Sequence, residues 1–177
     1  MVTTLLRIHL PGVAAGLLAL TIAATAADPP PVLHPVHDRK AAPAFALQDA
    51  SGKTLKLDDF HGKVVLLDFW ATWCTGCKTE IPWFTEFQKS YGANGYATVG
   101  VSMDEEGWKV LRPFLDEHKI PYPMLLGDES MAKQYGVETL PDTFLIDRHG
   151  RVAAAYLARL VDRDDIEAKI KTLLAEH

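Results

Sequence analysis

The sequence has few cysteines and no excess of positive charge. Only two of its 177 residues are cysteine, Cys74 and Cys77, which is too few for a disulfide-dense scaffold. Lys and Arg number 18 against 23 Asp and Glu, a formal net charge of −5, so the charge balance indicates no nucleic-acid partner. Apolar residues make up 48% and charged residues 23%. This composition excludes a disordered chain, a collagen and a multi-span membrane protein, and the length predicts one domain.

Residues 1–26 have the pattern of a secretory signal peptide. Arg7 is their only formally charged side chain, an apolar stretch covers residues 10–23, and Ala24-Thr25-Ala26 supplies the small residues of a cleavage site. The alternative is an uncleaved membrane anchor, because the apolar run approaches the length of a spanning helix. We therefore expect a periplasmic or otherwise extracytoplasmic protein, which contacts a membrane only if this segment is retained.

Residues 27–43 are predicted to be a proline-rich linker that precedes a folded domain over residues 44–177. Five prolines lie between Asp28 and Pro43 with little apolar patterning. Such a composition is typical of a tether or an extended strap.

Beyond the linker, strand patterns alternate with helix patterns. A mixed central sheet covered by helices on both faces, an α/β fold, is the architecture that this alternation predicts. The predicted elements in chain order are a hairpin of residues 45–47 and 53–57, a buried strand 64–69, a helix 74–91, a strand 96–103, a helix from Trp108 to about His118, a strand 124–126, a short helix, a hairpin of residues 143–147 and 152–157, and a terminal helix containing Ile166, Ile170, Leu173 and Leu174.

The two cysteines follow a predicted strand and open a predicted helix. A helix N-terminus carries free N–H groups and about half a positive charge, which lowers the pKa of a thiol there. Cys74 would lie at that end and Cys77 nearly one turn later, so the two sulfurs can meet. Cys74 could then attack a substrate disulfide, and Cys77 would attack Cys74 and release the reduced substrate.

Two other uses of the cysteine pair are open from the residues alone. A zinc site normally has four ligands, but the chain has no second cysteine pair, and His34, His37 and His61 fall in the linker or in a loop. The other alternative is a purely structural disulfide. The spacing and the helix context favour redox exchange, and we predict neither a metal nor another cofactor.

The run Asp68-Phe69-Trp70-Ala71-Thr72-Trp73-Cys74-Thr75-Gly76-Cys77 resembles the active-site signature of the thioredoxin superfamily, in particular that of exported TlpA/ResA-type proteins. A second matching stretch covers residues 135–147, and the resemblance extends over about residues 43–175. It implies a thioredoxin-like fold with an N-terminal hairpin and a central strand–helix insertion near residues 96–118.

The resemblance also implies how a substrate would bind. Pro141 would be a cis-proline that faces the cysteine pair and presents the backbone of Leu140 to an extended substrate segment. Trp73, beside the nucleophile, would form an apolar lip of the contact surface. The alternatives are an ordinary trans turn proline at residue 141 and plain core packing for Trp73.

Two carboxylates are candidates to accept the proton of Cys77. A carboxylate can do so if burial raises its pKa toward neutrality. Glu80 lies three residues after Cys77 on the same helical face and matches the active-site Glu of ResA-like proteins. Asp68 lies in an otherwise apolar strand and matches the buried Asp of thioredoxins. We predict that the two acids and Cys77 titrate as a coupled set. The alternatives are a solvated Glu80 and an Asp68 satisfied by local hydrogen bonds.

The sequence departs from the family pattern near the candidate site. Asp68 stands where many TlpA-like proteins carry Asn. The dipeptide Thr75-Gly76 lacks the proline common in strong reductants of this fold. Asp142 stands where Thr is frequent, although the cytochrome c maturation branch has Glu there. Near Arg159 the family usually has a Gly beside the active-site surface. An Arg would crowd or charge that surface and so affect the choice of partner.

The function that these features favour is an exported thiol–disulfide oxidoreductase acting as a reductase of protein disulfides. The resemblance implies electrons from a membrane thiol carrier and a disulfide-containing protein substrate, of which apocytochrome c is the best single expectation. Alternatives are a disulfide oxidant or isomerase, a thiol peroxidase, and a copper chaperone that would use His61.

Overall fold

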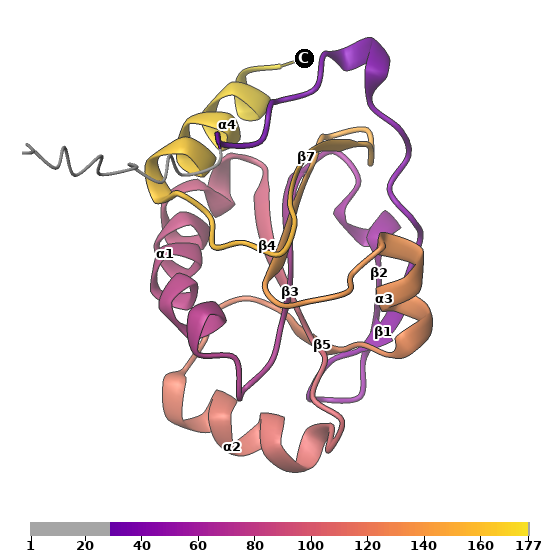
Figure 1. Cartoon of the computed structure of the whole chain (residues 1–177), viewed down its shortest axis with the longest axis vertical. Helices are drawn as coiled ribbons and strands as arrows, with labels where there is room; N and C mark the ends of the chain where they lie inside the picture. The colour runs from indigo at the N-terminus through magenta and orange to yellow at the C-terminus, as the bar shows by residue number, and fades with distance from the viewer. Residues whose placement is uncertain (1–28, 177) are drawn as a thin grey trace, which may run out of the picture.

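The computed structural model describes residues 29–176, so the predicted signal peptide lies outside the described residues. A central sheet has the strand order β5-β4-β3-β6-β7 (Figure 1). Its strands are β3 (Val64–Trp70), β4 (Tyr96–Ser102), β5 (Met124–Leu126), β6 (Asp142–Ile146) and β7 (Val152–Tyr156). Strands β3, β4 and β5 are parallel, while β6 is antiparallel to both β3 and β7. The predicted mixed sheet is therefore confirmed.

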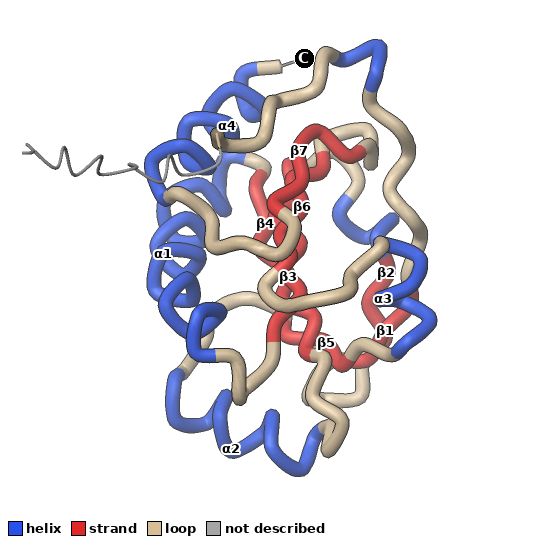
Figure 2. Tube along the Cα trace, viewed as in Figure 1, coloured by secondary structure: helices blue, strands red, loops and turns tan. Residues whose placement is uncertain are grey.

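Helices cover both faces of this sheet (Figure 2). They are α1 (Thr75–Tyr91), α2 (Trp108–His118), α3 (Glu129–Tyr135) and α4 (Arg163–Ala175). Side chains of α1, α2 and α4 pack with Leu66 and Trp70 in one half of the core. Side chains of α3 pack with Leu67 and Phe69 in the other half. Because its two faces are both covered, every residue of β3 is buried, as the continuous apolar run predicts.

The predicted N-terminal hairpin and central insertion are both present. Strands β1 (Ala46–Gln48) and β2 (Thr54–Lys56) pair in antiparallel fashion as a separate small sheet. The insertion is β4 followed by α2. Helices α1 and α2 continue through an internal proline each, Pro82 and Pro113. Single-turn 3-10 helices, η1 (Val36–Asp38), η2 (Leu57–Phe60) and η3 (Gly92–Asn94), occur in the connections.

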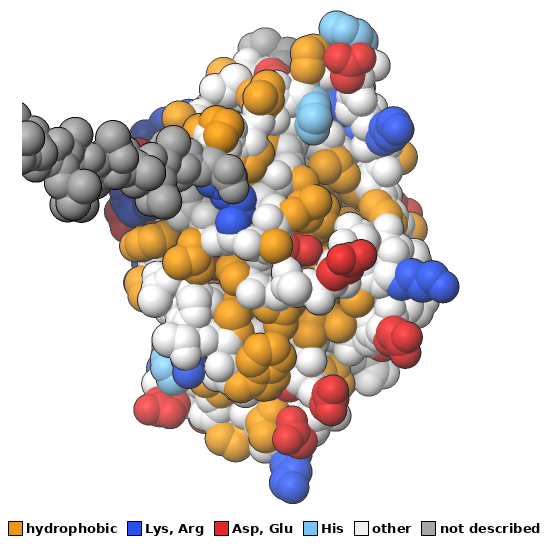
Figure 3. All heavy atoms as spheres, in the orientation of Figure 1, with side chains coloured by type: hydrophobic (Ala, Val, Ile, Leu, Met, Phe, Trp, Pro, Cys, Tyr) orange, Lys and Arg blue, Asp and Glu red, His pale blue; other side chains and the backbone are white. Residues whose placement is uncertain are grey.

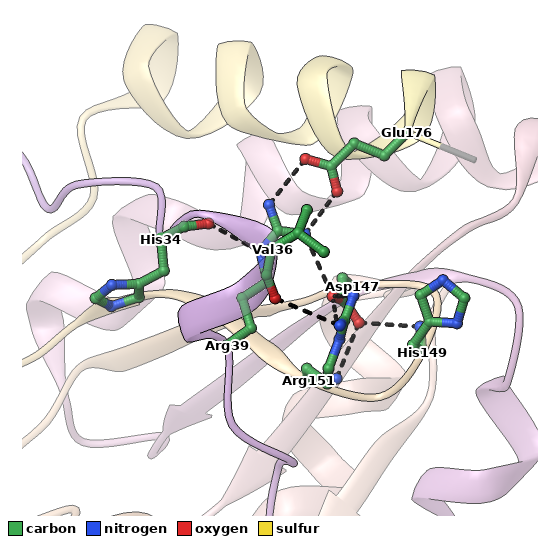
Figure 4. Close-up of polar contacts among 7 residues, drawn as sticks. All are labelled: His34, Val36, Arg39, Asp147, His149, Arg151 and Glu176. Atoms are coloured by element: carbon green, nitrogen blue, oxygen red, sulfur yellow. Dashed lines mark hydrogen bonds and ion pairs between the residues drawn. The ribbon is translucent and has the colours of Figure 1, made fainter.

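The proline-rich segment lies against the domain as a strap. The His34 amide donates to Ala153 O at 2.8 Å, and the Val152 amide donates to Lys40 O at 2.8 Å. Arg39 forms ion pairs with Asp147 at 3.2 Å and with Glu176 at 2.6 Å (Figure 4). These contacts hold the strap along β7 and α4. No helix within residues 29–176 is long and apolar enough to cross a membrane.

Candidate active site

The cysteine pair lies where β3 ends and α1 begins. Cys74 is the N-cap residue of α1, and its Sγ accepts a hydrogen bond from the Cys77 amide at 3.2 Å. The two sulfurs form a disulfide across a Cα–Cα distance of 5.4 Å. The predicted geometry is therefore present, with Cys74 at the positive end of the helix. Donation from the Cys77 amide and the helix dipole both favour a thiolate at Cys74 once the disulfide is reduced.

The two cysteines differ in their access to solvent. Cys74 is 8% exposed, whereas Cys77 has no exposed surface. Trp73, immediately before Cys74, is 64% exposed. Because Cys74 is at the surface and Cys77 beneath it, an incoming group meets Cys74 first. The exposure of Trp73 favours a contact role over core packing.

The Leu140–Pro141 peptide bond is cis, as the resemblance implies. Strand β6 begins at Asp142, whose register partner is Phe69 near the end of β3. The antiparallel pairing therefore brings Pro141 to the end of the sheet from which Cys74 emerges. Leu140 and Trp73 line one shallow, mainly apolar groove, and hydrophobic side chains gather around the loops that flank β6 and β7 on the face drawn in Figure 3.

Glu80 lies one turn after Cys77 on α1, and it is fully buried. Its Oε1 accepts a hydrogen bond from the Val161 amide at 2.6 Å. Burial raises the pKa of Glu80 to about 7, and the Val161 hydrogen bond opposes this rise. The structure therefore excludes a solvated Glu80. A carboxyl with a pKa near neutrality can both accept and return a proton under ordinary conditions.

Asp68 lies on β3, and it is 1% exposed. Its Oδ1 accepts a hydrogen bond from Thr143 Oγ1 at 3.2 Å. Burial raises the pKa of Asp68 well above its ordinary value, and repulsion from Glu80 adds to the rise, against the Thr143 hydrogen bond. A coupled titration of these two acids with Cys77 stays a prediction.

Three buried polar atoms near these acids have no hydrogen-bond partner within residues 29–176. They are Glu80 Oε2, Tyr122 Oη and Trp70 Nε1. The side chains of Trp70 and Tyr122 belong to the same half of the core as Cys77, and the acids Asp68 and Glu80 both raise the pKa of Tyr122, although less than burial does. Tyr122 is thus a buried polar residue in this half of the core that the sequence does not single out. An isolated Tyr before a short strand carries no signal for such a place.

Asp142 is a third buried carboxyl at this end of the sheet, 2% exposed. Its Oδ1 accepts a hydrogen bond from the Ala158 amide at 2.5 Å. Burial raises its pKa, the Ala158 hydrogen bond opposes the rise, and Glu138 adds to it. The sequence marks Asp142 as a departure from the family pattern, but nothing in the sequence indicates its contact with a loop 16 residues later.

The histidines weighed as metal ligands lie away from the cysteines. His61 precedes β3 and Cys74 follows it, so the two are separated by the length of a seven-residue strand, roughly 20 Å. His34 and His37 are exposed on the strap. Within residues 29–176, no group of three or more His, Cys, Asp and Glu side chains is placed to hold a metal ion.

Comparisons with known proteins agree with this geometry. Residues 39–155 match the AhpC/TSA family. The chain is 38% identical over 115 residues to the thiol-disulfide oxidoreductase ResA of Bacillus thuringiensis subsp. konkukian, covering 64% of this chain and 65% of the relative. It is 32% identical over 131 residues to the thioredoxin-like protein YneN of Bacillus subtilis, covering 73% and 76%. The chain thus spans just under two thirds of that ResA relative.

Solved structures show the same fold. A Chlorobium tepidum protein, provisionally named thiol:disulfide interchange protein DsbE, superposes with a TM-score of 0.72 at 34% identity, over 77% of this chain and 97% of that one. The thioredoxin domain of the thiol-disulfide oxidoreductase BVU-2223 from Bacteroides vulgatus gives a TM-score of 0.68 at 26% identity, over 76% and 96%. The predicted thioredoxin-like fold is confirmed.

Proposed function

The chain belongs to the AhpC/TSA family of thioredoxin-like proteins, and on that premise we propose that it is a thiol–disulfide oxidoreductase. The observation that carries the proposal is the Cys74–Cys77 disulfide at the N-terminus of α1, with the buried carboxyl of Glu80 one turn behind Cys77. Similarity to proteins named thiol-disulfide oxidoreductase ResA supports it.

The reaction proceeds in two exchange steps when the pair is reduced. The Cys74 thiolate attacks one sulfur of a substrate disulfide, a Cys74–substrate disulfide forms, and the other substrate sulfur leaves as a thiolate. Cys77 then loses its proton, attacks Cys74 Sγ and releases the second substrate thiolate. The Cys74–Cys77 disulfide is restored, and the substrate has gained two electrons and two protons.

Glu80 and Asp68 serve the second step in this proposal. Cys77 is fully buried, so its proton needs an internal acceptor. Glu80, with a pKa of about 7, accepts it directly or through Asp68. Trp73, Leu140 and cis-Pro141 form the surface against which the substrate segment lies, with the backbone of Leu140 available for strand-like hydrogen bonds.

We further propose the reductase direction, in an extracytoplasmic compartment. The signal-peptide pattern of residues 1–26 supports export, and an exported pair needs a supply of electrons to act as a reductant. A membrane thiol carrier would supply them, and a protein disulfide such as that of apocytochrome c would receive them. The family resemblance is the support for both partners.

The first experiment is to measure the reduction potential of the Cys74–Cys77 pair in residues 27–177 against defined thiol buffers. A potential near that of thioredoxin, about −270 mV, supports the reductase direction, whereas one near that of DsbA, about −120 mV, overturns it in favour of a disulfide oxidant or isomerase. Loss of both thiols within seconds in micromolar peroxide would instead support a thiol peroxidase.

A second experiment tests the exchange chemistry itself. Cys77→Ser should accumulate a mixed disulfide between Cys74 and a disulfide-containing peptide, because the resolving thiol is gone. Cys74→Ser is the matched control and should trap nothing. If Cys77→Ser traps no peptide under conditions that oxidise the wild type, the proposed function is wrong.

A further inference from the structure

The loop between β7 and α4 is held by two buried carboxyls from different elements. This segment, residues 157–162, is called the β7–α4 loop below. Glu80 on α1 accepts a hydrogen bond from the Val161 amide at 2.6 Å. Asp142 at the start of β6 accepts one from the Ala158 amide at 2.5 Å. The carboxyl proposed to move a proton therefore fixes one end of the loop, and Asp142 fixes the other.

Ala158 has a backbone conformation that requires support from its surroundings. Its φ is +52°, in the left-handed region that residues with a Cβ rarely adopt. Of the described residues other than glycine, only Lys119, at a helix end, shares a positive φ. The Asp142 hydrogen bond is made to the amide of this same residue. A strained backbone conformation of this kind persists when neighbouring groups hold it in place. Asp142 is such a neighbour, because it accepts the hydrogen bond from the Ala158 amide.

The β7–α4 loop exposes two apolar side chains, and one of them lies beside the cysteine segment. Leu157 is 50% exposed and Leu160 is 46% exposed. A Cβ added at Gly76 would lie 3.0 Å from Leu160 Cδ2, so Leu160 packs on one of the two residues between Cys74 and Cys77. Trp73 is 64% exposed immediately before Cys74. The cysteine segment is thus adjoined by two exposed apolar side chains, Trp73 of its own segment and Leu160 of the loop.

We propose that Asp142 is a positioning residue that sets substrate preference by holding the loop that places Leu160 beside the cysteine pair. The preferred substrate is an extended segment with an uncharged, apolar residue next to its disulfide cysteine, which packs on Leu160 while the cysteine meets Cys74. This inference rests on the proposed function and adds the substrate specificity of the oxidoreductase.

Asp142 also joins this loop to the other side of the site. It directly follows cis-Pro141, whose neighbour Leu140 lines the groove with Trp73. A single side chain therefore connects the strand that would bind substrate backbone with the loop that would bind a substrate side chain. Leu160 lies between the Ala158 amide, which Asp142 holds, and the Val161 amide, which Glu80 holds. Loss of the Asp142 contact therefore removes one of the two anchors that flank Leu160.

The test compares Asp142→Ala with Asp142→Asn, whose amide oxygen can still accept from the Ala158 amide. Two disulfide peptides that differ only in Leu or Ser beside the cysteine serve as probes, together with 2-hydroxyethyl disulfide. For Asp142→Ala we expect KM for the Leu peptide to rise about tenfold with kcat nearly unchanged. The Ser peptide and 2-hydroxyethyl disulfide should react within twofold of the wild-type rate, and Asp142→Asn should behave as the wild type.

Several results would overturn the inference. One is an Asp142→Ala variant that loses rate equally on all three probes, because Asp142 would then act on the cysteines themselves. Another is an unchanged preference for the Leu peptide, and a third is Asp142→Asn failing as Asp142→Ala does. If Asp142→Ala does not fold, Leu160→Ser is the second variant, and an unchanged Leu-over-Ser preference there would also contradict it.

The same experiment separates this inference from the proposed function. If the wild type oxidises its thiols with none of the three probes, the oxidoreductase proposal fails. If the wild type reacts with all three and shows no preference between the peptides, the oxidoreductase proposal stands and the role of Asp142 is refuted.

Discussion

Two aspartates at the ends of β6 are both buried, yet their surroundings are opposite. Asp142 opens the strand beside cis-Pro141 and is 2% exposed; Asp147 directly follows it and is 3% exposed. Asp147 forms ion pairs with Arg39 at 3.2 Å and Arg151 at 2.8 Å and accepts hydrogen bonds from the backbone amides of His149 and Arg151 (Figure 4). Asp142 accepts one backbone hydrogen bond and has no ion pair within residues 29–176.

The pKa values follow these surroundings. Burial alone would raise the pKa of Asp147, but hydrogen bonds from Arg151 and Arg39 hold it below 3.8. Burial raises the pKa values of Asp68, Glu80 and Asp142. At one end of the sheet, Asp147 is neutralised by Arg39 and Arg151, and its pair with Arg39 attaches the strap. At the other end, the buried carboxyls of Asp68 and Glu80 form no ion pair among residues 29–176, and burial keeps their pKa values raised.

The largest effect should come from removing the neutralised carboxylate. Asp147→Ala leaves Glu176 as the one carboxylate partner of Arg39 among residues 29–176 and should lower the free energy of unfolding by about 3–5 kcal/mol. Since the pKa of Asp147 is lowered in the folded state, its contribution is present above about pH 3.8 and is lost as the pH falls through the lower folded value. Urea unfolding at pH 7 and pH 3 measures both effects.

The rate with 2-hydroxyethyl disulfide is the control for Asp147→Ala. It should stay within twofold of the wild-type rate, because the variant changes the end of the sheet opposite the cysteines. A large loss of rate in a folded variant would contradict the claim that Asp147 attaches the strap without affecting the cysteine chemistry.

At the other end, removing a charge should stabilise the protein. Glu80 has a folded pKa of about 7 against 4.5, so between these values the folded state binds more protons and the free energy of unfolding falls as the pH rises. The full penalty, on the order of 3 kcal/mol, is present above pH 7. Glu80→Gln should be more stable than the wild type by up to this amount at pH 8, and equally stable below pH 4.5.

Urea unfolding of the oxidised proteins across pH 4–8 measures this crossover. Gln keeps an oxygen that can accept from the Val161 amide, so the substitution removes the charge and retains the contact. A variant that is less stable than the wild type at pH 8 would show that Glu80 is a structural carboxylate like Asp147.

The smallest effect should come from the outer cation of the Asp147 network. Arg151 is 28% exposed, whereas the Arg39 side chain is 2% exposed. Arg151→Gln leaves Asp147 with Arg39 and two backbone amides, so we expect a loss of about 1 kcal/mol. A thermal or urea unfolding experiment measures it, and a loss as large as that of Asp147→Ala would mean that the buried pair with Arg39 contributes little.

The sequence predicts the fold and the cysteine site because their signals are local. The apolar run at β3 and the cysteine spacing each determine a short segment. Glu80 and Asp68 are predictable for the same reason, one from helical spacing and one as an acid inside an apolar strand.

The contacts that the sequence does not predict join residues far apart in the chain. Arg39 pairs with residues 108 and 137 positions away. The sequence of the proline-rich segment therefore looks the same whether the segment is a loose tether or a strap held against the domain. Tyr122 and the Asp142–Ala158 contact depend on how elements pack across the sheet. A charged or polar residue whose partner is distant in the chain has no sequence periodicity that would reveal the contact.

The most direct test of the central claim measures the two exchange steps separately as a function of pH. Reduced protein mixed with 5,5′-dithiobis(2-nitrobenzoate) releases one thionitrobenzoate when Cys74 attacks and a second when Cys77 resolves the mixed disulfide. We predict that Glu80→Gln slows the second release at pH 7 by about 100-fold and removes its inflection near pH 7, that Asp68→Asn slows it less, and that the first release is unchanged. Wild-type profiles for the second release in both variants would contradict the account.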